Sequence, residues 1–460
     1  MIIQPMKLDF IEFLCYNIQK TGRKQMKRSI TLLFVIFAML LQACAPVDEG
    51  EEPVSINTDE TTEEEKEILT VVADGKTEFE IIRPDETDGV RSHLFTSFYK
   101  EFNERFSCNI ESNSDILALV YKVDPNAKEI LIGDTNRDAS AALKEKLTAA
   151  GGNRFGIMAT DCKIVINGTG WYQCYLALDY FINNFASVDE SGRVTVSVEC
   201  GFEYISEQCD DAAYAIEELV SSGKEIAFAA TEKVLKFQNK NGAGTVQGGC
   251  TDGKYVYAGM MGTGDDGVEY GVISKYDLST GELIKYSERL PLFHTNDLTY
   301  DAKNNRIVVA TLDAGWTRLS FVDADTLEYQ GDFIAPVGIR GLEYLPETNQ
   351  YVAAGIGIEI MLLDENFNKL SSHICKDQTL MTQGLYSDGE YVYDPRYLEG
   401  RAVHLMVVED MDGNLISSAN IFGLSTAEPE HMYRLNGDLY IGCNHSGWLF
   451  KIEVIPQNWW

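Results

Sequence analysis

The sequence predicts a multidomain protein in which a small α/β (α+β) domain is followed by an all-β five-bladed β-propeller. Strand-like and helical segments alternate between residues 68 and 223, a pattern typical of α/β and α+β domains. Between residues 232 and 455 the chain repeats itself at intervals of 43 to 49 residues, which is the period of a four-stranded propeller blade. A chain of 460 residues also exceeds what one hydrophobic core usually serves.

Residues 1–43 are predicted to be a signal peptide. Two basic residues after Met26 are followed by an apolar run over residues 30–41 and then by Leu-Gln-Ala-Cys, ending at Cys44. The run is too short to span a bilayer but matches the apolar region of an export signal, and Met26 offers a second start of translation. The last four residues resemble the lipobox of bacterial lipoproteins, which implies lipidation of Cys44 and a membrane anchor on the extracytoplasmic face. An ordinary signal peptide with no role for Cys44 is the alternative.

Residues 44–67 form a predicted acidic linker. Between residues 48 and 67 there are ten Asp or Glu and a single Lys, so like charges repel and nothing apolar can collapse. The whole chain is acidic as well, with a formal net charge of −33. Such a field repels phosphate backbones, so no nucleic-acid partner is expected.

The cysteines and acidic loops predict no metal site and no cofactor. Of ten cysteines, Cys15 and Cys44 precede the predicted domains, and the other eight show no CxxC pair and no metal-ligand spacing. They are interpreted mainly as buried free thiols, with disulfides between near neighbours as the alternative. A loop with Asp265 and Asp266 has residues that suit Ca²⁺ but lacks the full ligand spacing, so a solvated hairpin tip is favoured there.

The first domain, over residues 68–223, is predicted from apolar periodicity. Its expected elements are strands at 68–72, 79–82, 129–132, 155–159, 163–167 and 194–204, and helices at 92–106, from Asp138 onward and at 171–185. Asp138 follows a turn at residues 133–137 and is expected to cap its helix.

Two strings in this domain carry a family resemblance. They are EILIGDTNR at residues 129–137 and DCKIVINGTGWYQCYLALDYFI at residues 161–182. Together they resemble the accessory N-terminal domain that precedes the catalytic barrel in α-glucuronidases and β-hexosaminidases, over about residues 129–185. That domain is not catalytic and no barrel follows here, so the resemblance implies a carbohydrate-associated context and no hydrolase activity. A generic spacer is the alternative.

Each of the five repeats starts with a strand, a polar turn and a second strand rich in β-branched or aromatic residues. Third strands follow, and several lead through an Asp-containing turn to a fourth, outer strand. The fifth repeat lacks this outer strand, whereas residues 233–237 form a spare strand before the first repeat. We expect the spare strand to pair with the last blade and close the ring, because closure removes two exposed sheet edges.

The repeat pattern is similar to the five-bladed propellers of plant-type glutaminyl cyclotransferases. Gln-Gly heads two repeats, at Gln247 and Gln383, and the similarity spans about residues 234–455. It is a similarity of architecture. The acidic and aromatic pocket of those enzymes has no residue-by-residue match here, so their activity is not carried over.

One repeat position predicts a ligand site. The first strand of each blade lines the central tunnel, and one position on it is polar in all five repeats: Gln247, Asn296, Arg340, Gln383 and Glu430. Two residues further on, the repeats read Gly, Leu, Leu, Leu and Met. A polar ring at the mouth of a funnel suits a small polar ligand such as a sugar or a cell-wall fragment. The alternative is that these side chains bind only each other and ordered water.

Flanking residues add two weaker hypotheses. Glu430 and His294 could serve as a general acid/base pair, and Trp316 could stack on a sugar or belong to the core. No complete catalytic motif is present, so a binding function is favoured over an enzymatic one.

The predicted function is a lipid-anchored extracytoplasmic module that binds a glycan or another small polar ligand in the funnel. A hydrolase, lyase or cyclotransferase acting in the same funnel is one alternative. A platform for an envelope protein partner is the other.

Overall fold

The computed structural model describes most of the chain from Glu67 to Trp460. The described ranges are 67–116, 124–209, 220–222, 225–312, 316–377, 381–398, 403–424 and 428–460. Residues 65–460 form one compact unit, to which all of the following refers. The predicted signal peptide, Cys44 and almost all of the predicted linker lie outside the described residues. None of the described helices has an apolar stretch long enough to cross a bilayer.

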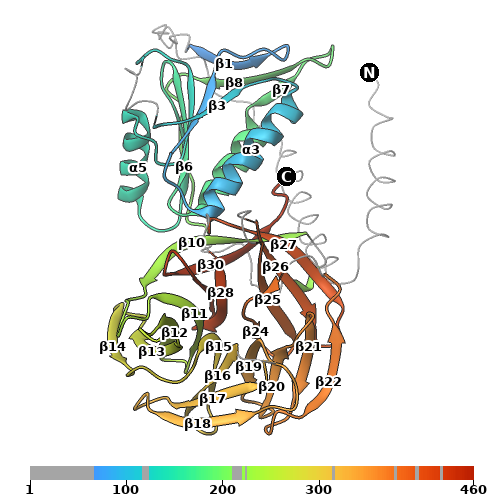
Figure 1. Ribbon diagram of the computed structural model, residues 1–460. Coiled ribbons are helices and arrows are strands. Elements are labelled where there is room, and N and C mark those ends of the chain that lie inside the picture. The colour runs from blue at the N-terminus through green and yellow to red at the C-terminus, as the bar shows by residue number, and fades with distance from the viewer. Residues whose placement is uncertain are drawn as a thin grey trace, which may run out of the picture. The chain divides into compact units, whose positions relative to one another are not determined.

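A six-stranded sheet is the centre of the first part (Figure 1). Its order is β3-β2-β4-β6-β5-β9. Strands β2, β3, β4 and β6 run parallel to one another, and β5 runs antiparallel to both of its neighbours, β6 and β9. The strands are β2 (Glu80–Arg83), β3 (Glu111–Ser114), β4 (Glu129–Ile132), β5 (Phe155–Ala159), β6 (Lys163–Gly168) and β9 (Glu203–Ile205). A smaller sheet has the order β1-β8-β7, from β1 (Ile68–Ala73), β7 (Ala186–Val188) and β8 (Val194–Glu199).

Three helices accompany this sheet: α3 (Gly89–Phe106), α5 (Asp138–Ala150) and α6 (Trp171–Asn184). They cover both faces of the sheet. Successive side chains along a strand point to opposite faces, so neighbouring residues of one strand pack against different helices. Ile130 and Ile132 of β4 belong to the core that includes α3 and α6, whereas Leu131 between them belongs to the core beneath α5. Burial on both faces explains the continuous apolar runs of these strands.

The helix starts agree only partly with the sequence prediction. Asp88 caps α3, since its Oδ1 accepts a hydrogen bond from the backbone N–H of Arg91 at 2.7 Å. The prediction that Asp138 caps α5 is wrong. Arg137 takes the cap position, without a side-chain bond, and Asp138 is the first helical residue. Its carboxylate still interacts favourably with the positive end of the helix dipole there.

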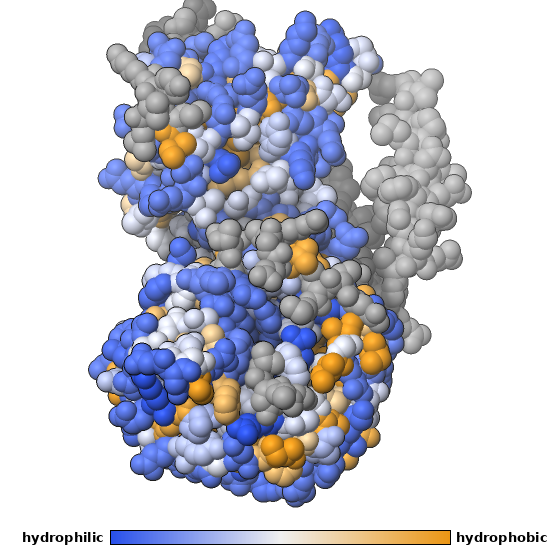
Figure 2. All heavy atoms as spheres, viewed as in Figure 1, coloured by the Kyte–Doolittle hydropathy of each residue, from blue (hydrophilic) through white to orange (hydrophobic). Residues whose placement is uncertain are grey.

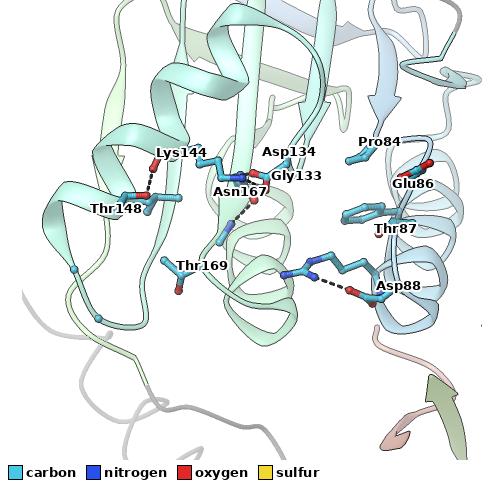
Figure 3. A pocket seen from close by; sticks show the side chains of 16 residues that line it. Pro84, Glu86, Thr87, Asp88, Gly133, Asp134, Lys144, Thr148, Asn167 and Thr169 are labelled. Carbon is cyan, nitrogen blue, oxygen red and sulfur yellow. Dashed lines mark hydrogen bonds and ion pairs between the residues drawn. The ribbon is translucent and has the colours of Figure 1, made fainter. Parts of the chain in front are cut away.

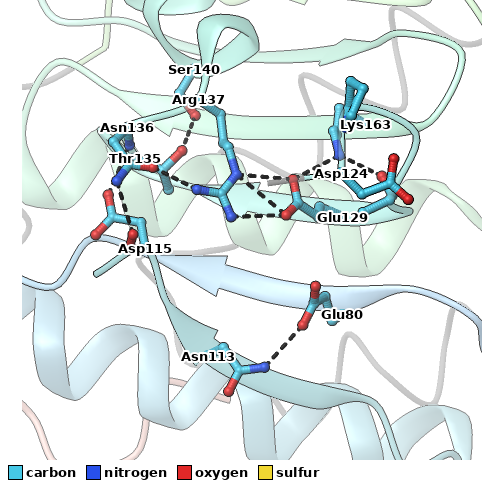
Figure 4. A network of polar contacts seen from close by, with 12 residues as sticks. Glu80, Asn113, Asp115, Asp124, Glu129, Thr135, Asn136, Arg137, Ser140 and Lys163 are labelled. Atoms are coloured by element: carbon cyan, nitrogen blue, oxygen red, sulfur yellow. Dashed lines mark hydrogen bonds and ion pairs between the residues drawn. The ribbon is translucent and has the colours of Figure 1, made fainter. Parts of the chain in front are cut away.

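The turn after β4 is held by buried ion pairs (Figure 4). Glu129 is 1% exposed and pairs with Arg137 at 2.9 Å and with Lys163 at 2.8 Å. Asn136 donates its backbone N–H to Asp115 Oδ2 at 2.8 Å. The first and last residues of the EILIGDTNR string, Glu129 and Arg137, therefore contact each other, and this contact fixes the turn.

The second part is built from antiparallel sheets in chain order. Three of them are separate four-stranded sheets, β11–β14, β15–β18 and β19–β22. Their strands are β11 (Thr245–Thr251), β12 (Tyr255–Thr263), β13 (Glu269–Asp277), β14 (Glu282–Tyr286), β15 (His294–Asp301), β16 (Arg306–Leu312), β17 (Arg318–Asp323), β18 (Tyr329–Ile334), β19 (Gly341–Leu345), β20 (Gln350–Ala354), β21 (Glu359–Leu363) and β22 (Lys369–Ile374).

The remaining strands form one larger sheet. They are β10 (Ile226–Lys236), β23 (Met381–Thr382), β24 (Tyr386–Ser387), β25 (Tyr391–Leu398), β26 (Val403–Asp410), β27 (Leu415–Phe422), β28 (Pro429–Leu435), β29 (Asp438–Cys443) and β30 (Trp448–Pro456). Strand β10 pairs antiparallel with β30 along its whole length, and Phe228 and Ala229 also pair in parallel with β27. The spare strand of the sequence analysis thus lies next to the last strand of the chain.

The first strands of the repeats contact one another in a ring. β11 contacts β15 and β28, β15 contacts β19, and β24 contacts both β19 and β28. These first strands are buried, whereas fourth strands such as β14 and β22 are largely exposed. Sheets that radiate from buried first strands make the fold mostly β and propeller-like.

The two parts share one hydrophobic core. Ala227, Ala229 and Ile455 of the second part lie in the same cluster as α3 and α6. The start of α3 is close to the second part as well: a Cβ added at Gly89 would lie 2.8 Å from the carbonyl oxygen of Phe422 and 2.9 Å from that of Ala230. Only glycine allows this approach of two backbones.

The surface is mostly hydrophilic on the face drawn in Figure 2, in keeping with the net charge of −33. Large apolar side chains that do reach solvent include Ile334 of β18 and Leu370 and Ile374 of β22. They lie on fourth strands, where one face of the sheet meets solvent.

Candidate functional site

The five predicted ring residues all belong to the first strands or their immediate starts. Gln247 lies in β11, Asn296 in β15 and Glu430 in β28, and all three are buried. Arg340 directly precedes β19, and Gln383 follows β23; both are half-buried.

The ring position interrupts the regular pairing in three of the five repeats. The ladder shifts register between Val246 and Gly248, between Thr295 and Asp297, and between Pro429 and His431. Gln247, Asn296 and Glu430 are the extra residues of these irregularities. The other two ring residues, Arg340 and Gln383, lie outside the paired strands. A bulge re-aims the side chain of its extra residue, and bulges are frequent beside functional sites.

Asn296 connects three repeats. Its Nδ2 donates hydrogen bonds to the carbonyl oxygen of Arg340 at 2.5 Å and to that of Gln383 at 3.2 Å. The donor group of this amide is therefore occupied by the protein itself, so Asn296 positions the neighbouring ring residues.

A carboxylate that the sequence analysis missed lies beside Asn296. Asp297 is 1% exposed and accepts backbone hydrogen bonds from Leu298 at 2.9 Å, Leu342 at 2.9 Å and Leu385 at 3.4 Å. The three N–H groups come from three different repeats. Burial raises the pKa of Asp297 well above its ordinary value, although the three N–H donors act in the opposite direction.

A signal for this residue is present in the repeats. The position after the ring reads Gly248, Asp297, Gly341, Gly384 and His431. A Cβ at Gly384 would lie 2.5 Å from the carbonyl oxygen of Glu430 and 3.1 Å from Asp297 Oδ1. The three glycines thus leave the space that Asp297 and His431 fill.

Two of the ring residues, Arg340 and Gln383, and their partners Trp316 and Glu428 form what we call the mouth cluster. The Arg340 guanidinium lies 4.4 Å from the centroid of the Trp316 ring, a cation–π contact. Gln383 Nε2 donates to Glu428 Oε1. Asn296 holds the backbones of Arg340 and Gln383 together, so the two pairs start from neighbouring backbone positions.

Arg340 has unused hydrogen-bonding capacity. Its Nε is buried and has no partner among the described residues. Burial lowers the pKa of the guanidinium, and the nearby Asp394 carboxylate partly offsets this. A buried donor without a partner is costly.

The proposed acid/base pair is not in contact. No hydrogen bond or ion pair joins His294 to Glu430 in the described part of the chain. The acidic groups that act on His294 are Glu269 and Glu428, which raise its pKa, while burial has the larger effect and lowers it. Burial raises the pKa of Glu430 well above its ordinary value, and Glu428 acts in the same direction.

A second buried pair, also missed from the sequence, supports the site. Arg396 is fully buried and contacts Asp394 Oδ2 at 2.7 Å, and its Nη2 donates to Cys375 Sγ at 2.8 Å. Thr382 Oγ1, directly before Gln383, donates to the same Asp394 oxygen at 3.0 Å. The Asp-Pro-Arg triplet of β25 gave no indication of a buried ion pair in the sequence, because two charged residues on one strand normally face solvent.

The loop at Asp265 and Asp266 is an exposed hairpin tip. Asp266 Oδ1 accepts the backbone N–H of Val268 at 3.0 Å, so this carboxylate stabilises its own turn. Across the described ranges no group of three or more His, Cys, Asp or Glu could hold a metal ion. The eight cysteines after Cys44 are free thiols; Cys174, Cys250, Cys375 and Cys443 are buried.

No protein-family model matches this sequence, and no curated protein matches it. Among solved structures, hydrazine synthase of Kuenenia stuttgartiensis is similar with a TM-score of 0.30 and 12% identity, over 48% of this chain and 64% of that one. The Cps50 (Swd1) β-propeller domain of Myceliophteria thermophila is similar with a TM-score of 0.28 and 12% identity, over 45% of this chain and 65% of that one. The chain spans less than two thirds of the length of either. The family resemblances stay predictions.

Proposed function

We propose that this protein is a lipid-anchored extracytoplasmic binding module whose mouth cluster takes a carbohydrate or cell-wall fragment. In this proposal the second part is a closed five-bladed β-propeller, and the first part is an accessory domain like that of α-glucuronidases and β-hexosaminidases. Lipidated Cys44 and the acidic linker would hold both parts away from the membrane.

The observation that carries this proposal is the repeated irregularity at the ring position. Regular strands would alternate their side chains between the two faces of a blade. Bulges at Gln247, Asn296 and Glu430 break that alternation at one level of three repeats. Arg340 on Trp316 then offers a donor and an aromatic face, and Gln383 with Glu428 offers an amide and a carboxylate. Such groups suit the hydroxyls and C–H faces of a sugar.

Binding measurements test the proposal. The full-length protein is screened on a glycan array, and hits are titrated by calorimetry against Arg340→Ala and Trp316→Ala. Loss of a hydrogen-bonding guanidinium is expected to weaken binding by roughly 1.5–3 kcal/mol. Arg289→Ala is the matched control. Arg289 also stacks on an aromatic side chain, 4.5 Å from the centroid of the Tyr270 ring, but it is not one of the five polar ring residues or their partners. Equal affinity in all four proteins would refute binding at the mouth cluster.

An enzyme is the second candidate, and the state of Glu430 favours it. A carboxyl group whose pKa is raised by burial keeps its proton to a higher pH than an exposed one, which suits it to act as a general acid. Turnover of glycosides and N-terminal-Gln peptides by the full-length protein would be lost in Glu430→Gln. Turnover that survives this substitution rules out Glu430 as the acid.

A further inference from the structure

The first part contains a cavity of about 520 Å³ at one edge of its central sheet (Figure 3). The segments that follow the parallel strands β2 and β4 line it, together with the end of β6, through Pro84, residues 86–88, residues 133–134 and residues 167–169. The carboxyl ends of parallel strands are the usual place for ligands in α/β sheets. The volume falls within the range of roughly 300–1,000 Å³ of small-molecule sites.

Two ion pairs face each other across this cavity (Figure 3). On one side Arg91 Nη1 lies 2.5 Å from Asp88 Oδ2. On the other side Lys144 Nζ lies 2.7 Å from Asp134 Oδ2. Asn167, which is 4% exposed, donates its Nδ2 to Asp134 Oδ1 at 2.7 Å and so fixes the second pair.

One polar atom in the cavity wall has no partner. The hydroxyl oxygen of Thr87 is buried, and no group in the described chain forms a hydrogen bond with it. Thr87 lies between Glu86 and Asp88 in the segment that follows β2. A sheltered hydroxyl without a partner costs free energy, and rotation of the Thr87 side chain, which lines the cavity, would let a ligand group recover this cost.

The charges indicate what kind of ligand fits. Asp88 with Arg91 and Asp134 with Lys144 neutralise each other, which leaves Glu86 as the unpaired charge of the lining. A phosphorylated or carboxylate ligand would meet this excess negative charge. The carboxylate of a zwitterion would have to displace Asp88 or Asp134 from its ion pair. A neutral ligand with several hydroxyls can instead donate to the carboxylates and accept from the guanidinium and ammonium groups while both pairs persist.

Apolar groups complete the lining. Pro84, Phe95 and Leu147 contribute to the wall, and a Cβ at Gly133 would lie 3.2 Å from Phe95 Cζ, so the aromatic ring packs beneath the turn after β4. Such surfaces cover the C–H groups of a sugar ring. We propose that this cavity, formed where β2, β4 and β6 end, binds a neutral saccharide of one or two rings. The site is separate from the mouth cluster and does not depend on it.

Calorimetric titration of the full-length protein tests the proposal. The neutral probes are glucose, galactose, xylose, N-acetylglucosamine and their common disaccharides; glucose 6-phosphate and alanine represent anions and zwitterions. Thr87→Val replaces the unpartnered hydroxyl by a methyl group of similar size, so it leaves stability unchanged or raised. Lys144→Met removes one donor from an exposed position. Each is expected to weaken saccharide binding about five- to tenfold.

Two controls separate this site from others. Lys146→Met lies on the same helix but pairs with Glu203, away from the cavity, and should bind as the wild type does. Arg340→Ala removes the guanidinium of the mouth cluster and should leave this binding intact. The proposal is overturned if no neutral saccharide gives saturable binding, if Thr87→Val and Lys144→Met bind unchanged, or if the anionic or zwitterionic probe binds more tightly than every neutral one.

Discussion

At the scale of single residues, the centre of the second part depends on one carboxyl group. Asp297 accepts N–H groups from three repeats at a place where its own exposure is 1%. Such N–H groups would otherwise be buried without a partner, which costs roughly 1–3 kcal/mol each. The burial that makes the contacts valuable also disfavours the negative charge, and therefore the pKa of Asp297 is raised.

Asp297→Asn is expected to lower the free energy of unfolding by about 1–3 kcal/mol near pH 4, because the amide NH₂ would face backbone donors that a carboxyl oxygen accepts. The raised pKa sets the pH dependence. The folded state keeps the proton after the unfolded state has lost it, so this group's stabilisation is complete below about pH 3.9 and is lost as pH rises through the folded pKa. The deficit of the variant should therefore shrink from pH 4 to pH 8.

Urea unfolding of both proteins across this pH range measures the effect. Asp388→Asn is the control, since Asp388 lies exposed in a turn and accepts only local backbone N–H groups. A deficit that stays constant with pH would contradict a raised pKa at Asp297.

The sequence alone indicated the ring but not the carboxylate beside it. In a regular strand Asn296 and Asp297 would point to opposite faces. A prediction based on this alternation therefore assigns Asn296 to the ligand site and leaves Asp297 out. The register shift between Thr295 and Asp297 changes this local geometry. The sequence does show that the position after the ring is glycine in three repeats and Asp297 or His431 in the other two. This difference in size indicates that the two large side chains occupy the space left by the three glycines.

At the scale of secondary structure elements, the strands were predictable where their burial is periodic. The end of the predicted helix at residue 106 agrees with α3, and its start lies three residues earlier than predicted. The strands β3 and β7 were missed. β3 reads Glu-Ser-Asn-Ser at the edge of its sheet, and β7 is exposed along its length, so neither carries an apolar signal.

The packing of β28 against β29 and β11 depends on the small size of two glycines, Gly442 in β29 and Gly249 in β11. His431 is fully buried and lies opposite Gly442. A Cβ at Gly442 would lie 2.0 Å from the imidazole Cε1 and Nε2, and one at Gly249 would lie 2.5 Å from Nε2. Burial also lowers the pKa of His431 to about 3, so the ring is neutral in the folded protein.

Gly442→Ala should lower the free energy of unfolding by about 1–3 kcal/mol, because the added methyl group overpacks this contact. His431→Ala makes room for the methyl group, so the double variant should be more stable than the sum of the two single effects predicts. Guanidinium unfolding of the four proteins of this cycle gives the coupling free energy. Additive effects would show that the strain at Gly442 comes from another neighbour.

At the scale of the whole described unit, the C-terminal residues join the first part to the second. Trp459 lies 5.0 Å from Tyr175 and 5.9 Å from Trp171 between ring centroids. Trp460 donates its Nε1 to Asp179 Oδ1 at 3.2 Å. The sequence predicted two separate domains, and the shared core could not be foreseen, because a terminal Trp-Trp pair has no periodicity that would identify the surface it covers.

Replacing both Trp459 and Trp460 by Ala should therefore loosen the first part without unfolding the second. Removing a buried Trp typically costs about 3–5 kcal/mol, and here that loss is confined to the contacts with α3 and α6. Hydrogen exchange should speed up in α3 and α6 while the strands β11 to β22 stay protected, and calorimetry should separate one unfolding transition into two. Trp448→Ala is the matched control, because Trp448 lies on β30, where Lys236 packs 5.3 Å from its ring. If exchange instead rises equally in β11 to β22, the C-terminal residues stabilise the unit as a whole and the two parts form one cooperative unit.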